Sequence, residues 1–250
     1  MSKRQLLHVL IVPDCHIPYH DQRAFALMLT AARAVGVDVV VILGDFVDFV
    51  AVSGHAKNPR ETLKLPEEIA AGRRALRQIK ALGAAKNVFI AGNHEDRLWR
   101  YLVSKAPELA ETVTLQSLLR LEKYGFDYVA YRHSFKMGHM RYTHDVGFAG
   151  KNAAAQSMEA MGRNLVIGHC HRMSYHVMGT LDGGRHVGIS LGWLGDVNAI
   201  DYMARDKATK DWTLGFGFGY YDPASAYTTI QPVPIMPDYS CIVAGTKFQG

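Results

Sequence analysis

Residues 88–96 read V-F-I-A-G-N-H-E-D, an apolar run that ends in a glycine and is followed at once by polar side chains. A short apolar run bounded by a turn signal predicts a buried β-strand. The turn itself needs only Gly92 and an asparagine, so the polar residues that follow Asn93 exceed what the backbone requires. The stretch therefore predicts a strand whose carboxyl end delivers side chains that can bind a ligand.

Strand and helix signals alternate through the first half of the chain, on both sides of this stretch. Apolar runs predict buried strands over residues 8–13, 38–44 and 87–92. Helical patterns are found over residues 21–36, 66–82 and 95–123. Asp21 is placed as the N-cap of the first helix, and Pro66 suits the first turn of the second. This order of elements predicts an α/β domain with parallel strand pairing.

The second half of the chain has shorter strand signals. Strands are predicted over residues 127–131, 135–137, 140–144, 164–168, 212–221 and 226–233, and a helix over residues 151–161. The turn signal Asp182-Gly183-Gly184 predicts a hairpin formed by residues 173–181 and 185–191. The polar stretch between about residues 195 and 213 supports no prediction of secondary structure.

Composition and charge are those of an ordinary globular protein. The 250 residues are 48% hydrophobic and 20% charged, and no linker or change of composition interrupts them, so we expect a single domain over residues 1–250. No apolar run approaches the roughly 20 residues of a membrane span, and the first residues make a poor signal peptide. Three widely spaced cysteines predict no disulfide framework and a cytoplasmic location. The net charge of +5 suits anionic partners and an ordinary solvated surface equally.

Polar side chains that suit metal ions follow the strand signals. They are Asp14 and His16 in D-x-H, Asp45 and Asp48 in G-D-F-V-D, Asn93 and His94 in G-N-H-E, His144, and His169 and His171 in G-H-C-H. Imidazole suits first-row transition metals, whereas carboxylate and amide oxygens suit harder divalent ions. Taken alone, D-x-H, Gly44-Asp45 and His144 are weak signals, since Asp14 could cap a turn and His144 could be an ordinary surface or buried histidine. G-H-x-H is more specific, because two histidines two residues apart after an apolar run have little packing value. Together, at the strand ends where open sheets bind ligands, they predict a catalytic metal site.

In this order, the D-x-H, G-D-x-x-D, G-N-H-E, single-histidine and G-H-x-H motifs resemble those of the calcineurin-like metallophosphoesterases, in the form of prokaryotic and phage members. The resemblance covers residues 14–171. It implies an α/β fold built as a four-layer α/β/β/α sandwich, with two mixed sheets and the metal site at the carboxyl ends of strands. Residues 8–171 would form the motif-bearing core, and residues 172–250 would complete the second sheet and the substrate pocket.

The resemblance also implies a site with two divalent metal ions. The ligands would be Asp14, His16 and His171 for one ion, Asn93, His144 and His169 for the other, and Asp45 between the two. His94 would face the substrate phosphate, stabilising charge or protonating the leaving oxygen, and Asp48 would fix its orientation by a hydrogen bond. The ions are expected to be Mn²⁺, with iron, Zn²⁺ or Ni²⁺ as alternatives.

The function implied by the resemblance is hydrolysis of phosphate esters by direct attack of a metal-bound hydroxide. The G-N-H-E-D-R wording favours phosphodiesters or nucleotides, and the absence of D-R-G after the second motif argues against a protein phosphatase. A DNA or RNA nuclease, a phosphomonoesterase and a non-catalytic interaction scaffold are the alternatives. The basic charge favours the nuclease modestly, although no dense Lys/Arg run is present. A scaffold would be expected to have lost ligands or the acid, and all of them are present.

Other residues near the motifs have less specific roles. Candidate substrate-binding residues, each also compatible with a surface position, are His55, Lys57, Arg60 and Arg97. Cys15 and Cys170 lie between candidate ligands and are expected to be buried, inert thiols. Glu95 and Asp96 are expected to begin a helix, where carboxylates interact favourably with the N-terminal end of its dipole.

Overall fold

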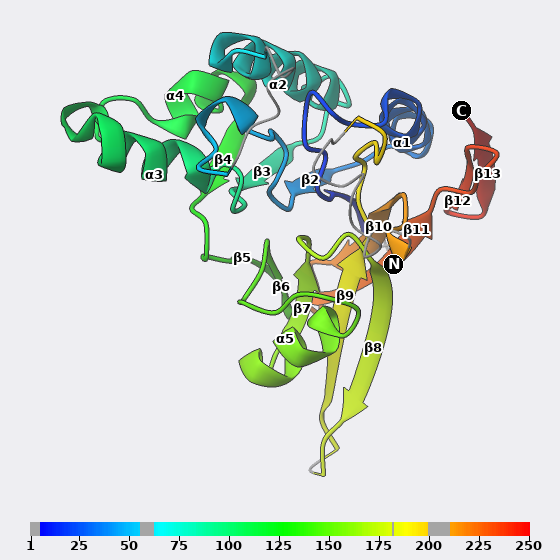
Figure 1. Ribbon diagram of the computed structural model, residues 1–250. Helices are drawn as coiled ribbons and strands as arrows, with labels where there is room; N and C mark the ends of the chain where they lie inside the picture. The colour runs from blue at the N-terminus through cyan, green and yellow to red at the C-terminus, as the bar shows by residue number, and fades with distance from the viewer. Residues whose placement is uncertain (1–5, 56–62, 182, 200–210) are drawn as a thin grey trace.

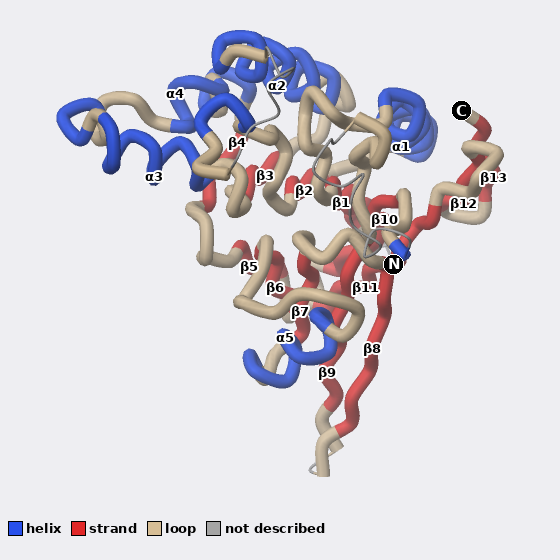
Figure 2. The backbone as a smooth tube through the Cα atoms, viewed as in Figure 1, coloured by secondary structure: helices blue, strands red, loops and turns tan. Residues whose placement is uncertain are grey.

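The computed structural model describes residues 6–55, 63–181, 183–199 and 211–250. Two large β-sheets pack face to face, and helices cover the outer face of each sheet (Figure 1, Figure 2). The layers follow the order α/β/β/α, so the fold class expected from the sequence is confirmed.

The first sheet carries the parallel strands of the N-terminal half. Its strands, in spatial order, are β11 (Tyr227–Pro234), β10 (Gly215–Asp222), β1 (Leu7–Val12), β2 (Val39–Ile42), β3 (Lys86–Ile90) and β4 (Phe126–Val129). The pairs β1–β2, β2–β3 and β3–β4 are parallel, whereas β10 is antiparallel to β1. The carboxyl ends of β1, β2 and β3 therefore meet at one edge of this sheet.

The second sheet is built from the later strands. They are, in spatial order, β5 (Phe135–Met137), β6 (Met140–Thr143), β7 (Asn164–Ile167), β9 (Arg185–Leu191) and β8 (Met173–Gly179). The pairs β6–β7 and β7–β9 are parallel, and β8 and β9 form the hairpin that the sequence predicts. Asp182 of its turn signal lies outside the described residues. The hairpin extends away from the rest of the molecule at the bottom of Figure 1.

Five α-helices are found in the described ranges. They are α1 (Gln22–Val35), α2 (Leu65–Lys80), α3 (Asp96–Lys105), α4 (Leu115–Leu119) and α5 (Ala153–Met161). The same ranges also contain three short 3₁₀ helices, η1 (Val50–Val52), η2 (Pro107–Leu109) and η3 (Glu122–Tyr124). The Asp21 side chain caps α1 by accepting a hydrogen bond from the Ala24 N–H, as predicted. The predicted helical stretch 95–123 is instead broken into short pieces, because Pro107 cannot continue α3.

The apolar core lies in two layers on either side of the first sheet. Val9 and Ile11 of β1 pack against the second sheet, whereas Leu10 and Val12 pack with the helical layer. All four side chains are fully buried. Burial on both faces explains why this strand reads as a continuous apolar run in the sequence.

Residues 172–250 contribute to both large sheets. They were expected to complete the second sheet, and β8 and β9 do lie there. However, β10 and β11 join the first sheet beside β1, and β12 (Ser240–Val243) and β13 (Thr246–Gln249) form a separate hairpin that was not predicted. The interleaving of early and late strands favours the single domain proposed from the sequence.

A buried glutamate in α2 holds the loop that follows the second motif. Glu68 is fully buried, and its carboxylate accepts hydrogen bonds from the N–H groups of Val50 at 2.8 Å and Ala51 at 3.0 Å. Burial raises the pKa of Glu68 from 4.5 to about 7. Between these two values the folded protein holds more protons at this site than the unfolded chain does. Ionisation of Glu68 therefore makes the protein less stable as the pH rises through this window.

We expect ionisation of Glu68 to lower the free energy of unfolding by up to about 3 kcal/mol between pH 5 and pH 8. The Glu68→Gln variant cannot ionise, so it lacks this contribution. Urea denaturation of both proteins at several pH values in this window measures the difference between them. Parallel pH profiles for the two proteins would contradict the prediction.

Candidate metal centre

The candidate metal-binding residues converge between the two sheets. Each follows a strand: Asp14 and His16 follow β1, Asp45 follows β2, Asn93 follows β3, His144 follows β6, and His169 and His171 follow β7. The side chains of Asp14, Asp45 and His144 are almost completely buried. Burying so many groups that prefer water or a cation is costly unless they bind an ion or one another.

The first set of residues consists of Asp14, His16 and His171. Their ligand atoms all lie within 4.8 Å of one another. The Nε2 atoms of His16 and His171 face each other at 3.1 Å, and the His171 Nε2 lies 3.4 Å from Asp14 Oδ1. The second carboxylate oxygen of Asp14 is buried without a hydrogen-bond partner among the described residues. A cation shared by these atoms would satisfy all of them.

The second set consists of Asp45, Asn93, His144 and His169. Asn93 Oδ1 lies 2.9 Å from His144 Nε2 and 3.0 Å from His169 Nδ1. Asp45 Oδ2 lies 3.3 Å from the same nitrogen of His144. Two imidazole nitrogens, a carboxylate and a neutral amide oxygen form a donor set that suits a divalent transition metal. The structure thus brings together all seven residues that the sequence predicts as ligands, in two groups that suit divalent ions.

A hydrogen-bonded network joins the second motif to the third. Asp48 Oδ2 lies 3.1 Å from His16 Nδ1 and 3.2 Å from His94 Nδ1. Arg97 donates to Asp48 Oδ1 at 3.0 Å and, through Nη2, to His94 Nε2 at 3.0 Å. Because a guanidinium group only donates, Nε2 of His94 is the acceptor and Nδ1 carries the proton. Burial opposes ionisation of Asp48, but its hydrogen bonds with His16 and His94 hold its pKa well below the usual value. Burial also lowers the pKa of His94.

Arg97 lies within this network, and its role in substrate binding stays a prediction. His55 is exposed, and its backbone N–H donates to Ser53 Oγ at 3.2 Å. This contact does not test its predicted role in substrate binding. Lys57 and Arg60 lie outside the described residues.

Glu95 lies at the start of α3, as expected, but its side chain makes contacts that the sequence did not predict. Its buried carboxylate accepts hydrogen bonds from the N–H groups of Asp45 at 2.9 Å, Val47 at 2.9 Å and Gly92 at 2.8 Å. Burial, reinforced by the charge of Asp45, raises its pKa to about 7. Glu95 thus ties together the loops after β2 and β3, and interaction with the helix dipole does not describe its contacts. Its place as the last residue of the G-N-H-E motif was the only signal in the sequence.

Gly92 allows these two loops to approach each other. A Cβ atom at this position would lie 2.2 Å from Asp45 Oδ1 and 2.4 Å from the Asp45 backbone nitrogen. Only glycine fits without displacing Asp45. This contact explains why β3 is followed by a glycine before its polar residues.

The two cysteines beside the candidate ligands are buried, as expected. The thiol of Cys15 donates to the Pro13 carbonyl at 3.3 Å, and the sulfur of Cys170 lies 2.9 Å from Ser190 Oγ. Burial raises the pKa of both thiols. Neither belongs to the groups that suit a metal ion.

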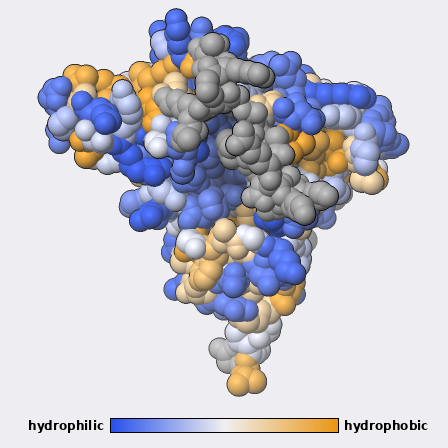
Figure 3. All heavy atoms as spheres, viewed as in Figure 1, coloured by the Kyte–Doolittle hydropathy of each residue, from blue (hydrophilic) through white to orange (hydrophobic). Residues whose placement is uncertain are grey.

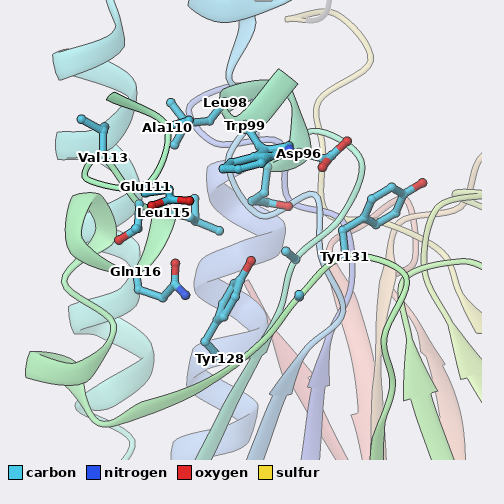
Figure 4. Close-up of a pocket in the computed structure, with 14 residues that line it drawn as sticks. Asp96, Leu98, Trp99, Ala110, Glu111, Val113, Leu115, Gln116, Tyr128 and Tyr131 are labelled. Atoms are coloured by element: carbon cyan, nitrogen blue, oxygen red, sulfur yellow. The ribbon is translucent and has the colours of Figure 1, made fainter. Parts of the chain in front are cut away.

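A cavity of about 480 Å³ lies beside α3 and α4 (Figure 4). Trp99, Tyr128 and Tyr131 supply aromatic rings to its lining. Glu95, which accepts a hydrogen bond from the Asp45 N–H, also lines this cavity. Tyr131 lines it as well, and the centroid of its ring lies 6.2 Å from that of the His144 ring. Figure 3 shows apolar atoms on the neighbouring surface around α3, where Trp99 is half exposed. None of the seven candidate ligands lines the cavity, so Glu95 and Tyr131 are the lining residues that connect it with the metal centre.

None of the helices in the described ranges combines the length and the apolar character that crossing a membrane requires.

Comparison with known proteins gives three kinds of match. A family model described as calcineurin-like phosphoesterase matches residues 7–173, about two thirds of the chain. The Gene 54 protein of Mycobacterium phage L5 is 26% identical over 261 residues, which cover 98% of this chain and 96% of that protein. Among solved structures, a single mutant of Vps29 from Entamoeba histolytica is 12% identical and covers 96% of each chain with a TM-score of 0.49. The E. coli phosphoesterase YfcE is 14% identical, covers 90% of this chain and 99% of its own, and has a TM-score of 0.42.

Proposed function

This chain belongs to the calcineurin-like phosphoesterase family, and from that premise we propose that it is a dinuclear metal-dependent phosphoesterase that hydrolyses phosphodiesters or nucleotides. The observation that supports this most is the convergence of two ligand groups, the first buried and the second partly buried, beside the His94–Asp48–Arg97 network. A site that bound metal for folding alone would have no need of such a network.

The proposed ligands divide as the resemblance implies. One ion is assigned to Asp14, His16 and His171, the other to Asn93, His144 and His169, and Asp45 is placed between them. Ions held there, Mn²⁺ in our proposal, would neutralise phosphate charge and lower the pKa of a water molecule towards ~7, which suits direct hydrolysis. Glu95 keeps the Asp45 backbone in place through its hydrogen bond to the Asp45 N–H.

His94 and Arg97 are proposed to act on the substrate. A guanidinium group binds a phosphate through two parallel N–H donors, so an incoming phosphate can draw Arg97 away from His94. Nε2 of His94 would then be free to take up a proton from water and pass it to the leaving oxygen. Asp48 Oδ2, which lies 3.2 Å from Nδ1 of His94, would hold the ring in its orientation.

Two observations support a phosphodiester or a nucleotide as the substrate. Asp48 is followed by Phe49 and not by the Arg-Gly of protein phosphatases. The aromatic cavity, which Glu95 also lines, has enough space for a base or an aryl group. A cytoplasmic location, proposed from the cysteine pattern, is compatible with three free, buried cysteines.

The test compares bis-p-nitrophenyl phosphate with p-nitrophenyl phosphate as substrates of the Mn²⁺-loaded protein. We expect faster turnover of the diester, and loss of both activities in the Asp45→Asn variant, which removes the carboxylate proposed to lie between the ions. Faster turnover of the monoester would make the protein a phosphomonoesterase. No turnover of either ester or of nucleotides by protein that binds two ions would favour the scaffold. Binding to DNA that weakens steeply with salt, together with strand cleavage, would favour the nuclease.

A further inference from the structure

His171 differs from two other candidate histidine ligands in how its ring is held. A histidine that binds a metal through one nitrogen usually donates from the other to an acceptor, which fixes the ring. Nδ1 of His16 has Asp48 at 3.1 Å, and Nδ1 of His144 has the Leu43 carbonyl at 2.8 Å. Nδ1 of His171 is buried and has no hydrogen-bond partner within the described ranges. Among the described residues, contacts with neighbouring rings are left to orient this imidazole from that side.

Two tryptophans surround the imidazole of His171. The Trp193 ring stacks on it, with 4.8 Å between centroids and 16° between planes. The Trp212 ring meets it nearly at a right angle, with centroids 4.1 Å apart, and the two indoles contact each other at 4.7 Å. Trp193 is only 2% exposed. The contacts restrict both the tilt and the rotation of the His171 ring.

The backbone that carries these tryptophans is bonded to the metal centre. The Thr213 N–H donates to the His171 carbonyl at 3.0 Å, and the Trp193 N–H donates to the Thr213 carbonyl at 3.1 Å. The next residue, Leu194, donates its N–H to the Asp14 carbonyl at 2.7 Å. The segment around Trp193 therefore holds two of the three residues of the first set.

Gly195 leaves room for the Trp193 ring. A Cβ atom on Gly195 would lie 2.2 Å from Cζ3 and 2.4 Å from Cε3 of that ring. The backbone of Gly195 is not in the left-handed region, so an alanine there would be opposed by the indole alone. Gly195→Ala is therefore a second way to displace Trp193.

We propose that Trp193, supported by Trp212, is a positioning residue for the metal site formed by Asp14, His16 and His171. It holds the His171 imidazole by ring packing, where other ligands use a hydrogen bond. The inference rests on the proposed metal centre and goes beyond it, because it concerns one ion position alone. Loss of the Trp193 ring should weaken this position and leave the other, with Asn93, unchanged.

The test measures Mn²⁺ binding to the metal-free full-length protein by calorimetry and by electron paramagnetic resonance. In Trp193→Ala we expect one of two bound ions to weaken by about 10- to 100-fold, while the other keeps its affinity. Gly195→Ala should weaken the same ion, and Trp193→Phe, which keeps an aromatic ring, should restore most of the affinity. Trp99→Ala removes a half-exposed tryptophan on α3 and serves as the matched control.

A second readout is the quenching of tryptophan fluorescence by Co²⁺. Occupancy of the first site should quench the emission of Trp193 and Trp212, so Trp99→Ala should keep the full change. Wild-type affinities for both ions in folded Trp193→Ala and Gly195→Ala would overturn the inference. If Trp193→Ala does not fold, Gly195→Ala and Trp193→Phe decide the question. A wild-type protein that binds no metal would instead overturn the proposed function, and with it this inference.

Discussion

Replacing His94 with glutamine is expected to lower kcat by about 10³-fold on a phosphate ester with an alkoxide leaving group. The variant removes the proton that Nε2 would deliver once Arg97 has turned to the phosphate. The backbone N–H of residue 94, which donates to Asp45 Oδ1 at 2.8 Å, is retained. The bound metal content should therefore remain that of the wild type. Steady-state kinetics together with elemental analysis of the purified variant measures both quantities.

The leaving group separates proton delivery from charge stabilisation. A p-nitrophenolate leaving group hardly needs a proton, so the loss of kcat with that ester should be much smaller than with a methyl ester. Equal losses for both esters would show that His94 stabilises charge without acting as an acid. An unchanged kcat for the methyl ester would contradict any direct role of this residue.

Replacing Gly92 with alanine is expected to weaken the binding of both metal ions, because Asp45 is proposed to lie between them, and to lower the free energy of unfolding by about 3 kcal/mol. The new Cβ would lie 2.2 Å from Asp45 Oδ1, so the loop after β2 has to move away. That movement also strains the hydrogen bonds that Glu95 makes with the N–H groups of Asp45 and Gly92. Chemical denaturation and metal titration of the variant measure the two effects.

Gly179 provides the matched control for this change. It ends β8, its backbone is not left-handed, and an added Cβ would meet nothing within 4 Å. Gly179→Ala should therefore change neither stability nor metal binding by a measurable amount. Similar behaviour of the two alanine variants would mean that the loops after β2 and β3 can separate without cost.

The candidate ligands could be predicted from the sequence because their chemistry is local. Each is a polar residue of unusual type at the end of an apolar run, and parallel pairing brings such ends to one edge. The regular elements around them, such as α1 with its Asp21 cap, are also specified by neighbouring residues. The strands β12 and β13 are only four residues each, too short for an alternating pattern to be recognised.

The supporting contacts could not be predicted because they join residues that are distant along the chain. The Glu95 carboxylate accepts a hydrogen bond from the N–H of Asp45, fifty positions earlier in the chain. No local sequence pattern predicts this contact. The stacking of Trp193 on His171 likewise depends on how β9 follows β7 in space. The break after α3 had a local signal in Pro107, which the prediction of a helical stretch over 95–123 did not take into account.

The position of β10 beside β1 also determines when the metal centre can be completed during synthesis. β1 pairs through Leu7 with Tyr221, so one side of the first strand to leave the ribosome stays without its partner until more than two hundred residues have followed. At roughly 5–20 residues per second, that interval lasts on the order of ten seconds or more. An unpaired strand edge can pair with another chain during this time. Nascent chains that stop before β10 should therefore aggregate more readily than the finished protein, and the Asp14 loop should reach its final geometry only near the end of translation.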